Sequence, residues 1–221
     1  MIYAFPGMGA DSRMYSGAWR TLPQCRFLDW SLYHGRSTIA ALEERLITEQ
    51  RIRAGDYLIG TSLGGIVACE IANRLDVAGL ALVGSAKNKG EISAVLRVLH
   101  PLASLTPLEF IQNAAGKVPG DLAQMFHEGQ APFIWAMCHA ICDWEGLDDT
   151  RIKPLRIHGR HDRVIPHPVG VQHWLDGGHL LVMTHSQECA ACIRDHWGGM
   201  RINSEAGGWH TPGREACMIG G

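Results

Sequence analysis

One pentapeptide, of the form Gly-x-Ser-x-Gly, constrains this chain more than any other feature. Residues 60–64 read GTSLG and follow a short apolar strand expected at 57–59. From residue 66 the apolar residues recur at helical spacing, which predicts a helix to about residue 73. Strand, sharp turn and helix form the setting in which this motif lifts a serine hydroxyl above a sheet edge. The pattern therefore nominates Ser62 as a nucleophile on a strained turn with positive φ.

Two backbone amides near Ser62 are candidates for holding a negatively charged oxygen. Leu63 is expected at the start of the helix, where its N–H has no helical acceptor. The second candidate is Met8, which lies between two glycines in the loop 6–11, PGMGAD. We expect both amides to act as oxyanion donors. An ordinary strand-to-helix turn also explains the Gly and Pro residues of that loop.

Apolar runs that alternate with helical patterns predict a doubly wound α/β fold. Strands are expected at 1–5, 26–30, 57–59, 77–83, 153–158 and 171–175. The run at 77–83 is apolar throughout, as in a parallel strand buried on both faces. Helices are also expected at 38–50, capped by Ser37 or Thr38, and at 187–196, capped by Ser186. This alternation predicts a mostly parallel six-stranded sheet.

The segment 85–150 breaks the alternation and contains no obvious strand. Helical stretches are expected there at about 91–100, 107–115, 120–128 and 131–143, with prolines between them. We expect this segment to be a small helical lid inserted into a core made of residues 1–84 and 151–197. An insertion at the carboxyl ends of the strands covers the crevice where α/β sheets bind ligands. The Gly-rich residues 198–221 are expected to form a flexible C-terminal tail.

A serine needs a base to take its proton, and the base needs an acid to orient it. Asp162 follows the strand at 153–158, and His179 follows the strand at 171–175. Both are therefore expected at the same sheet edge as Ser62, with His179 as the base and Asp162 as the acid. Asp176 is an alternative acid, but it precedes His179 by three positions in a turn and suits a surface role better.

The chain has twelve histidines, so a metal site competes with this interpretation. His158, His161 and His167 lie around Asp162 and are the candidate ligands. Their spacing matches no defined metal site, so we expect neither a metal nor an organic cofactor.

Apolar side chains of the lid are candidates for the substrate pocket. Trp135 is the bulkiest of them, and Met137 of the lid and Val164 of the loop at 158–166 complete the expected set. Packing of the lid onto the body is the alternative role for any one of these side chains.

Four motifs together resemble the α/β-hydrolase superfamily over about residues 1–196. They are FPGMGAD at 5–11, GTSLGG at 60–65, HGRHDRVIP at 158–166 and GGH at 177–179. The chain begins at what resembles the family's third strand, so the expected sheet lacks the two leading strands. The resemblance implies a serine hydrolase in which Ser62 attacks an acyl carbonyl, His179 is the base and Asp162 supports it.

The apolar lid favours a small or medium carboxylic ester, or a thioester, over a peptide as the substrate. The superfamily also contains C–C bond hydrolases, haloperoxidases and lyases, and these chemistries stay open as alternatives. A non-catalytic, ligand-binding member of the fold is a further alternative, although all three candidate triad residues are present.

Composition limits the partners that such a chain is expected to bind. The formal net charge of −2 gives no electrostatic reason to expect nucleic acid. No apolar run reaches transmembrane length, and no leader segment is evident before the first strand. Seven cysteines without a framework spacing favour a reducing compartment. We therefore expect a cytoplasmic monomer or homodimer that acts on a small-molecule acyl substrate.

Overall fold

The computed structural model describes residues 1–32, 35, 38–92, 120, 124–125, 128–166, 168–198, 202–203 and 208–209. Side chains are described for all of these except the last two pairs. The helical stretches expected at about 91–100, 107–115 and 120–128 lie wholly or largely outside the described residues, as does His167.

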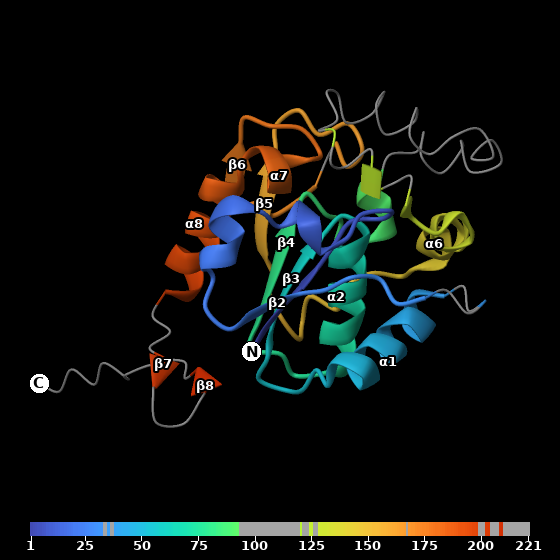
Figure 1. The fold of residues 1–221 in the computed structure, drawn as a ribbon, viewed down its shortest axis with the longest axis horizontal. Coiled ribbons are helices and arrows are strands. Elements are labelled where there is room, and N and C mark those ends of the chain that lie inside the picture. Colours follow the sequence, from blue (N-terminus) through green and yellow to red (C-terminus); the bar gives the residue numbers. More distant parts are fainter. Residues whose placement is uncertain are drawn as a thin grey trace, which may run out of the picture.

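A six-stranded sheet forms the centre of the molecule (Figure 1). Its strands are β1 (Ile2–Phe5), β2 (Cys25–Phe27), β3 (Tyr57–Thr61), β4 (Gly79–Val83), β5 (Leu155–Gly159) and β6 (His173–Leu175). They stand in the order β2-β1-β3-β4-β5-β6, and each neighbouring pair is parallel. The predicted six-stranded α/β sheet is therefore confirmed, and its pairing is parallel throughout.

The strand β2 is shorter than predicted and ends at Phe27. Beyond it, the Asp29 carboxylate accepts the Ser12 N–H at 2.8 Å, and the Trp30 indole N–H donates to the Gly7 carbonyl at 2.9 Å. These two side chains leave the sheet because they fasten the loop that follows β1. The strand expected at 26–30 is thus wrong over its last three residues.

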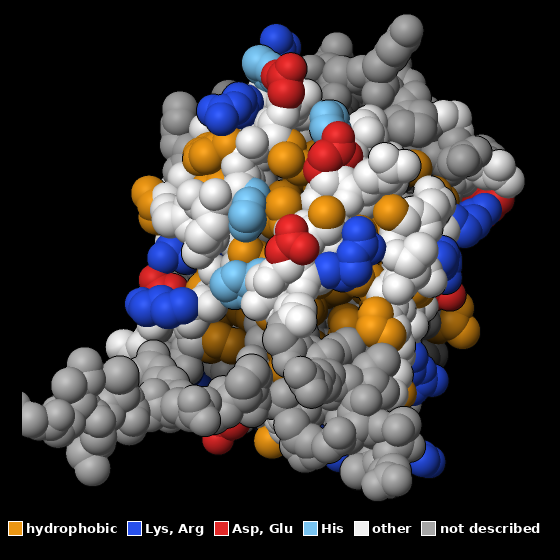
Figure 2. All heavy atoms as spheres, turned by 90° about the vertical axis from the view of Figure 1, so that its left-hand side faces the viewer, with side chains coloured by type: hydrophobic (Ala, Val, Ile, Leu, Met, Phe, Trp, Pro, Cys, Tyr) orange, Lys and Arg blue, Asp and Glu red, His pale blue; other side chains and the backbone are white. Residues whose placement is uncertain are grey.

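Helices cover both faces of the sheet (Figure 1). One face carries α1 (Ile39–Gln50), α2 (Leu63–Arg74) and α6 (Ala131–Asp143). The other face carries α7 (Leu181–Thr184), α8 (Ser186–Trp197) and the 3-10 turns Ser12–Met14 and Gly17–Thr21. A third 3-10 turn, Lys89–Glu91, follows β4. In the space-filling view from the α7/α8 side, basic and acidic side chains are scattered among apolar ones (Figure 2).

One predicted helix cap is confirmed and one is wrong. The Thr38 hydroxyl accepts the Ala41 N–H at 3.1 Å at the start of α1. Ser186, in contrast, is the first helical residue of α8, and His185 is the N-cap. The His185 N–H donates to Leu181 in α7. The chain therefore passes from α7 to α8 with a single intervening residue, which leaves no room for a separate capping turn.

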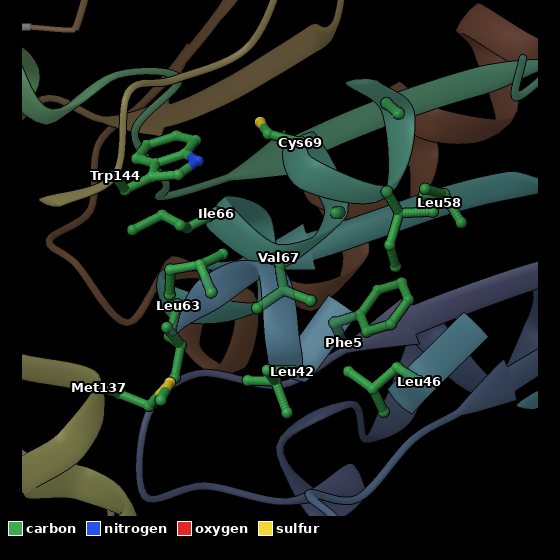
Figure 3. Close-up of a cluster of buried hydrophobic side chains, with 14 of the residues drawn as sticks. Phe5, Leu42, Leu46, Leu58, Leu63, Ile66, Val67, Cys69, Met137 and Trp144 are labelled. Atoms are coloured by element: carbon green, nitrogen blue, oxygen red, sulfur yellow. The ribbon is translucent and has the colours of Figure 1, made fainter. Parts of the chain in front are cut away.

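Side chains of the sheet alternate between two hydrophobic clusters, one on each face. Phe5 and Leu58 pack with Leu46 and Val67 on the α1/α2 face (Figure 3). Ile59, the neighbour of Leu58, belongs to the cluster on the α8 face. Burying each such side chain contributes roughly 1.5–3 kcal/mol. Both faces are thus apolar, as the uniformly apolar strands predict.

The helix α6 lies where a helix was expected in the insertion, and it packs on the body through Phe133 and Met137. After α6, the Trp144 indole N–H donates to Glu70 of α2 at 3.1 Å. The chain thus returns along α2 toward β5. A lid function for residues 85–150 stays a prediction.

Two further observations concern membrane-spanning helices and the C-terminal segment. Within the described residues, no helix combines the length and apolar character needed to span a membrane. In the segment expected to be a tail, β7 (Ile202–Asn203) and β8 (Gly208–Trp209) pair antiparallel.

Candidate active site

Ser62 stands on a strained turn between β3 and α2. Its backbone has φ 51° and ψ −119°, a conformation that costs on the order of 1–3 kcal/mol for a residue with a side chain. A Cβ on Gly64 would lie 2.3 Å from the Phe5 carbonyl oxygen, and one on Gly60 would lie 2.3 Å from the Gly65 Cα. Only glycine permits these approaches. The predicted strained turn with positive φ at Ser62 is confirmed.

The side chains expected to act as nucleophile, base and acid lie in one hydrogen-bonded row. The Ser62 Oγ lies 3.0 Å from His179 Nε2, and His179 Nδ1 lies 2.9 Å from Asp162 Oδ2. A carboxylate only accepts hydrogen bonds, so Nδ1 carries a proton, and Nε2 of the neutral ring accepts from Ser62. The three residues follow β3, β5 and β6, and their strands deliver them to the same sheet edge.

The carboxylate of Asp162 is enclosed, with a side chain 0% exposed. Its Oδ1 accepts the N–H groups of Val164 and Ile165 at 2.8 and 2.9 Å. Burial alone raises the pKa of Asp162. The charge of His179 and hydrogen bonds from His158, His179 and the Ile165 amide outweigh burial and hold this pKa well below its usual range. Asp162 is therefore ionised at neutral pH, as an acid that orients an imidazole must be.

The competing acid and the candidate metal ligands have other partners. Asp176 Oδ1 lies 2.8 Å from His161 Nε2, and both side chains are exposed. His158 is buried and contacts Asp162. Among the described residues, no group of three His, Cys, Asp or Glu side chains stands close enough together to hold a metal ion.

The two candidate oxyanion donors flank Ser62. Leu63 is the first residue of α2. On the other side, a Cβ on Gly7 would lie 3.7 Å from the Ser62 Cβ, so the Gly7–Met8 peptide adjoins the nucleophile. Within the described part of the chain, neither the Met8 nor the Leu63 N–H has a backbone or side-chain acceptor. Both amides are thus available to an oxyanion.

The three expected pocket residues lie in different environments. Met137 is 1% exposed and lies beside Leu63 (Figure 3). Trp135 is 37% exposed and stacks on His139, so it lies on the outer side of α6. Val164 is half-buried, and its amide holds Asp162. Met137 belongs to the same buried cluster as Leu63 at the start of α2, and Val164 packs against that cluster.

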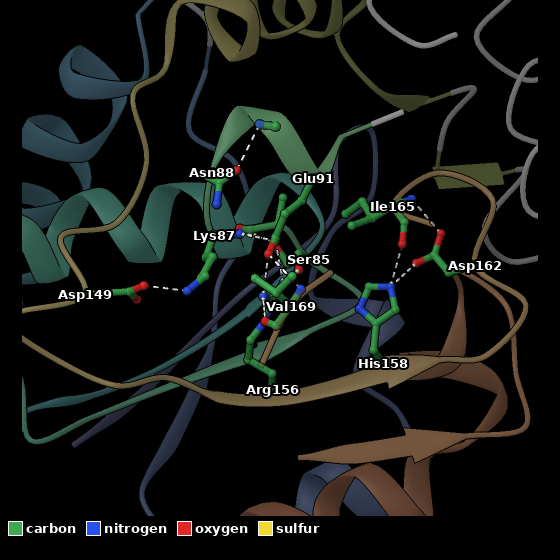
Figure 4. A network of polar contacts seen from close by, with 12 residues as sticks. Ser85, Lys87, Asn88, Glu91, Asp149, Arg156, His158, Asp162, Ile165 and Val169 are labelled. Carbon is green, nitrogen blue, oxygen red and sulfur yellow. Dashed lines mark hydrogen bonds and ion pairs between the residues drawn. The ribbon is translucent and has the colours of Figure 1, made fainter. Parts of the chain in front are cut away.

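Several supporting residues escaped the sequence analysis. The Trp30 indole holds the Gly7 carbonyl, and the Ser85 hydroxyl donates to the Ser62 carbonyl at 2.7 Å. Arg156 forms a buried ion pair with Glu91 (Figure 4). A charged Arg156 between Leu155 and Ile157 in a predicted strand was a signal in the sequence that a buried partner exists. Ser85 and Trp30 carry no such signal, because their partners are backbone carbonyls.

Comparison with known proteins agrees with this architecture. Residues 1–192 match the profile of the alpha/beta hydrolase family. Among curated proteins, no sequence matches the chain. A thermophilic esterase from Thermogutta terrifontis superposes with a TM-score of 0.69 at 17% identity, over 90% of this chain and 89% of that chain.

Two other solved structures are similar to a comparable degree. A hydrolase from Pseudomonas aeruginosa gives a TM-score of 0.71 at 18% identity, over 89% of each chain. The enol-lactonase of Burkholderia xenovorans gives 0.65 at 18% identity, over 88% of this chain and 89% of that chain. Structural likeness at such low identity shows the fold alone. The family match covers most of the chain and agrees with that fold, so the protein belongs to the alpha/beta hydrolase family and is a hydrolase.

Proposed function

We propose that the protein cleaves a small or medium carboxylic ester or thioester through a covalent acyl-enzyme. The observation that carries the proposal is the 3.0 Å contact between Ser62 Oγ and His179 Nε2, on a ring whose other nitrogen donates to Asp162. A positioned base of this kind converts a weak serine hydroxyl into a nucleophile. Asp162, fully enclosed and ionised, stabilises the imidazolium that forms.

The reaction then follows two steps with the same groups. In the first step, Ser62 attacks the acyl carbonyl, His179 takes its proton, and the Met8 and Leu63 amides hold the tetrahedral oxyanion. His179 returns the proton to the leaving alcohol or thiol. In the second step, His179 activates a water that attacks the acyl-enzyme and releases the acid. Each step uses only groups of this chain, the substrate and one water molecule.

Two features support a substrate with an apolar acyl group and an ester bond. Met8 and Met137 bring apolar, adaptable side chains to the region between Leu63 and α6. The similar proteins include a thermophilic esterase and an enol-lactonase, both of which by name act on ester bonds. A cytoplasmic monomer or homodimer, with residues 85–150 as the lid, completes the proposal; the cysteines among the described residues are free thiols.

The test is covalent labelling with a fluorophosphonate, read by intact mass, beside a panel of p-nitrophenyl esters of increasing chain length. We expect one adduct per chain and ester hydrolysis in the wild type, and neither in Ser62→Ala. The control is Ser16→Ala, because Ser16 is exposed and its side chain caps nothing. Labelling that persists in Ser62→Ala would place the nucleophile elsewhere. Labelling without ester hydrolysis would favour C–C bond cleavage or a ligand-binding role.

A further inference from the structure

A second histidine contacts the carboxylate that orients His179. His158 lies on β5, four positions before Asp162, and its ring is 1% exposed (Figure 4). Its Nε2 lies 3.0 Å from Asp162 Oδ2, the same oxygen that accepts from His179 Nδ1. Two imidazole rings therefore share one carboxylate oxygen.

The surroundings of His158 fix which of its nitrogens carries a proton. Nε2 also lies 2.9 Å from the Ile165 carbonyl oxygen. A carbonyl and a carboxylate both accept hydrogen bonds and donate none, so His158 Nε2 must be protonated. This N–H donates to the Ile165 carbonyl, and Asp162 Oδ2 lies 3.0 Å from the same nitrogen, so a positively polarised N–H adjoins the carboxylate.

We propose that His158 is a positioning residue that weakens the hold of Asp162 on the protonated form of His179, so that the base stays neutral to a lower pH. The proposal rests on the function proposed above. A hydrogen bond to the anion partly neutralises the charge that Asp162 presents to His179. The imidazolium of His179 is consequently less stable than beside an unshared carboxylate.

The contact from His158 is not needed to orient the carboxylate of Asp162. The Val164 and Ile165 amides already fix Oδ1, and neither of these two bonds involves the ring of His158. Removing the His158 N–H therefore leaves the carboxylate in place and its Oδ2 more negative. The consequence is an increase in the basicity of His179 rather than the loss of its partner.

Other charges near His158 are already balanced. Arg156, two positions earlier on the same face of β5, is paired with Glu91. The ring of His158 meets the edge of Trp174, which does not titrate, at 5.7 Å between centroids. Among the described residues, Asp162 and, through it, His179 are thus the ionisable groups that face His158. Asp176 and His161 form a separate pair on the surface.

The experiment compares His158→Phe with His158→Gln across the pH profile of kcat/KM on a p-nitrophenyl ester. Phenylalanine keeps a ring but no donor, whereas the amide of glutamine reaches about as far as Nε2 and keeps one. We expect the acid limb of His158→Phe to move up by about half a unit to one unit, with its plateau little changed. At pH values below the limb this shift lowers kcat/KM about 3- to 10-fold. His158→Gln should restore a limb near that of the wild type.

A lower stability of His158→Phe with an unmoved or lowered acid limb would overturn the proposal and leave His158 a structural residue. If His158→Phe does not fold, two-bond ¹H–¹⁵N spectra of the wild type test the same idea. We expect His158 in the Nε2–H form, with signals that shift as His179 titrates; an Nδ1–H form would overturn it. A wild type that neither labels with fluorophosphonate nor hydrolyses esters contradicts the proposed function instead, and the two failures are therefore distinguishable.

Discussion

The guanidinium of Arg156 donates two hydrogen bonds of 2.7 Å to the carboxylate of Glu91, and both side chains are buried. The pair joins the elements around the nucleophile. Arg156 also donates to the Ser85 carbonyl at 2.9 Å, and the Ser85 hydroxyl donates to the carbonyl of Ser62. Burial alone raises the pKa of Glu91. Hydrogen bonds from Arg156 and from the Lys87 and Val169 amides outweigh burial and hold this pKa below its usual range.

Glu91→Gln should lower the free energy of unfolding by about 3–5 kcal/mol at neutral pH, because it leaves a buried Arg156 without its counter-charge. The folded-state pKa of Glu91 is lowered, so its contribution is present above the unfolded value of about 4.3. The difference from wild type should therefore shrink as the pH falls below about 4.3. Urea unfolding at several pH values measures it. Glu49→Gln, which alters an exposed pair with Arg45, is the control and should cost at most about 1 kcal/mol. Equal effects of the two variants would contradict the prediction.

Replacement of the two candidate acids should separate them sharply. Asp162→Asn should reduce kcat by up to ~10⁴-fold, because the amide no longer selects the His179 tautomer that accepts from Ser62. Asp176→Asn should stay near wild type, because Asp176 is exposed and pairs with His161. Steady-state kinetics on one p-nitrophenyl ester, with circular dichroism as the check of folding, decide between them. A larger loss in Asp176→Asn would mean that the acid has been misassigned.

Chain-length preference should depend on the inner side of α6 rather than on its outer side. Truncation in Met137→Ala opens space beside Leu63 and should shift preference toward longer acyl chains, with about 1–3 kcal/mol of selectivity per methylene. Trp135→Ala removes a side chain from the outer side of α6 and should leave the ester profile unchanged. Met137→Leu, which nearly preserves volume, is the matched control. An altered profile in Trp135→Ala with none in Met137→Ala would place the pocket on the other side of the helix.

The sequence predicted what depends on local pattern. The apolar run at 77–83 and the alternation of strands with helical patterns predicted the sheet, and the positions of Ser62, Asp162 and His179 after three of its strands placed them at one edge. The hydrogen bonds that support the site could not be predicted from the sequence, because they join residues far apart in the chain and no sequence motif marks them. The strand expected at 26–30 includes Trp30. The hydrogen bond from the Trp30 indole N–H to the Gly7 carbonyl, which lies outside the strand pairing, is evident only from the three-dimensional structure. His158 is a candidate metal ligand by its position in the sequence, whereas its contact with Asp162 depends on the turn at 159–162.

Trp30 leads to the last prediction, which concerns the oxyanion donor at Met8. The carbonyl of Gly7 and the N–H of Met8 belong to one planar trans peptide, so they point in opposite directions. The Gly7 carbonyl accepts the Trp30 indole N–H at 2.9 Å and the Ala10 N–H at 3.2 Å. These two bonds fix the peptide plane and polarise it, which makes the Met8 N–H a better donor.

Trp30→Phe should therefore lower kcat by about 10-fold, with KM nearly unchanged, because an oxyanion forms only after the substrate is bound. The loss is smaller than the 10²–10³-fold typical of deleting an oxyanion donor outright, since the Ala10 bond remains. Fluorophosphonate labelling should slow in parallel, while the acid limb of the pH profile stays in place because His179 is untouched. Trp19→Phe is the matched control: it removes an indole N–H that donates to the Val182 carbonyl at 2.7 Å on the other face of the sheet. We expect that variant to lose stability and keep its kcat; a similar kcat in both variants would show that Trp30 supports the fold and not the oxyanion.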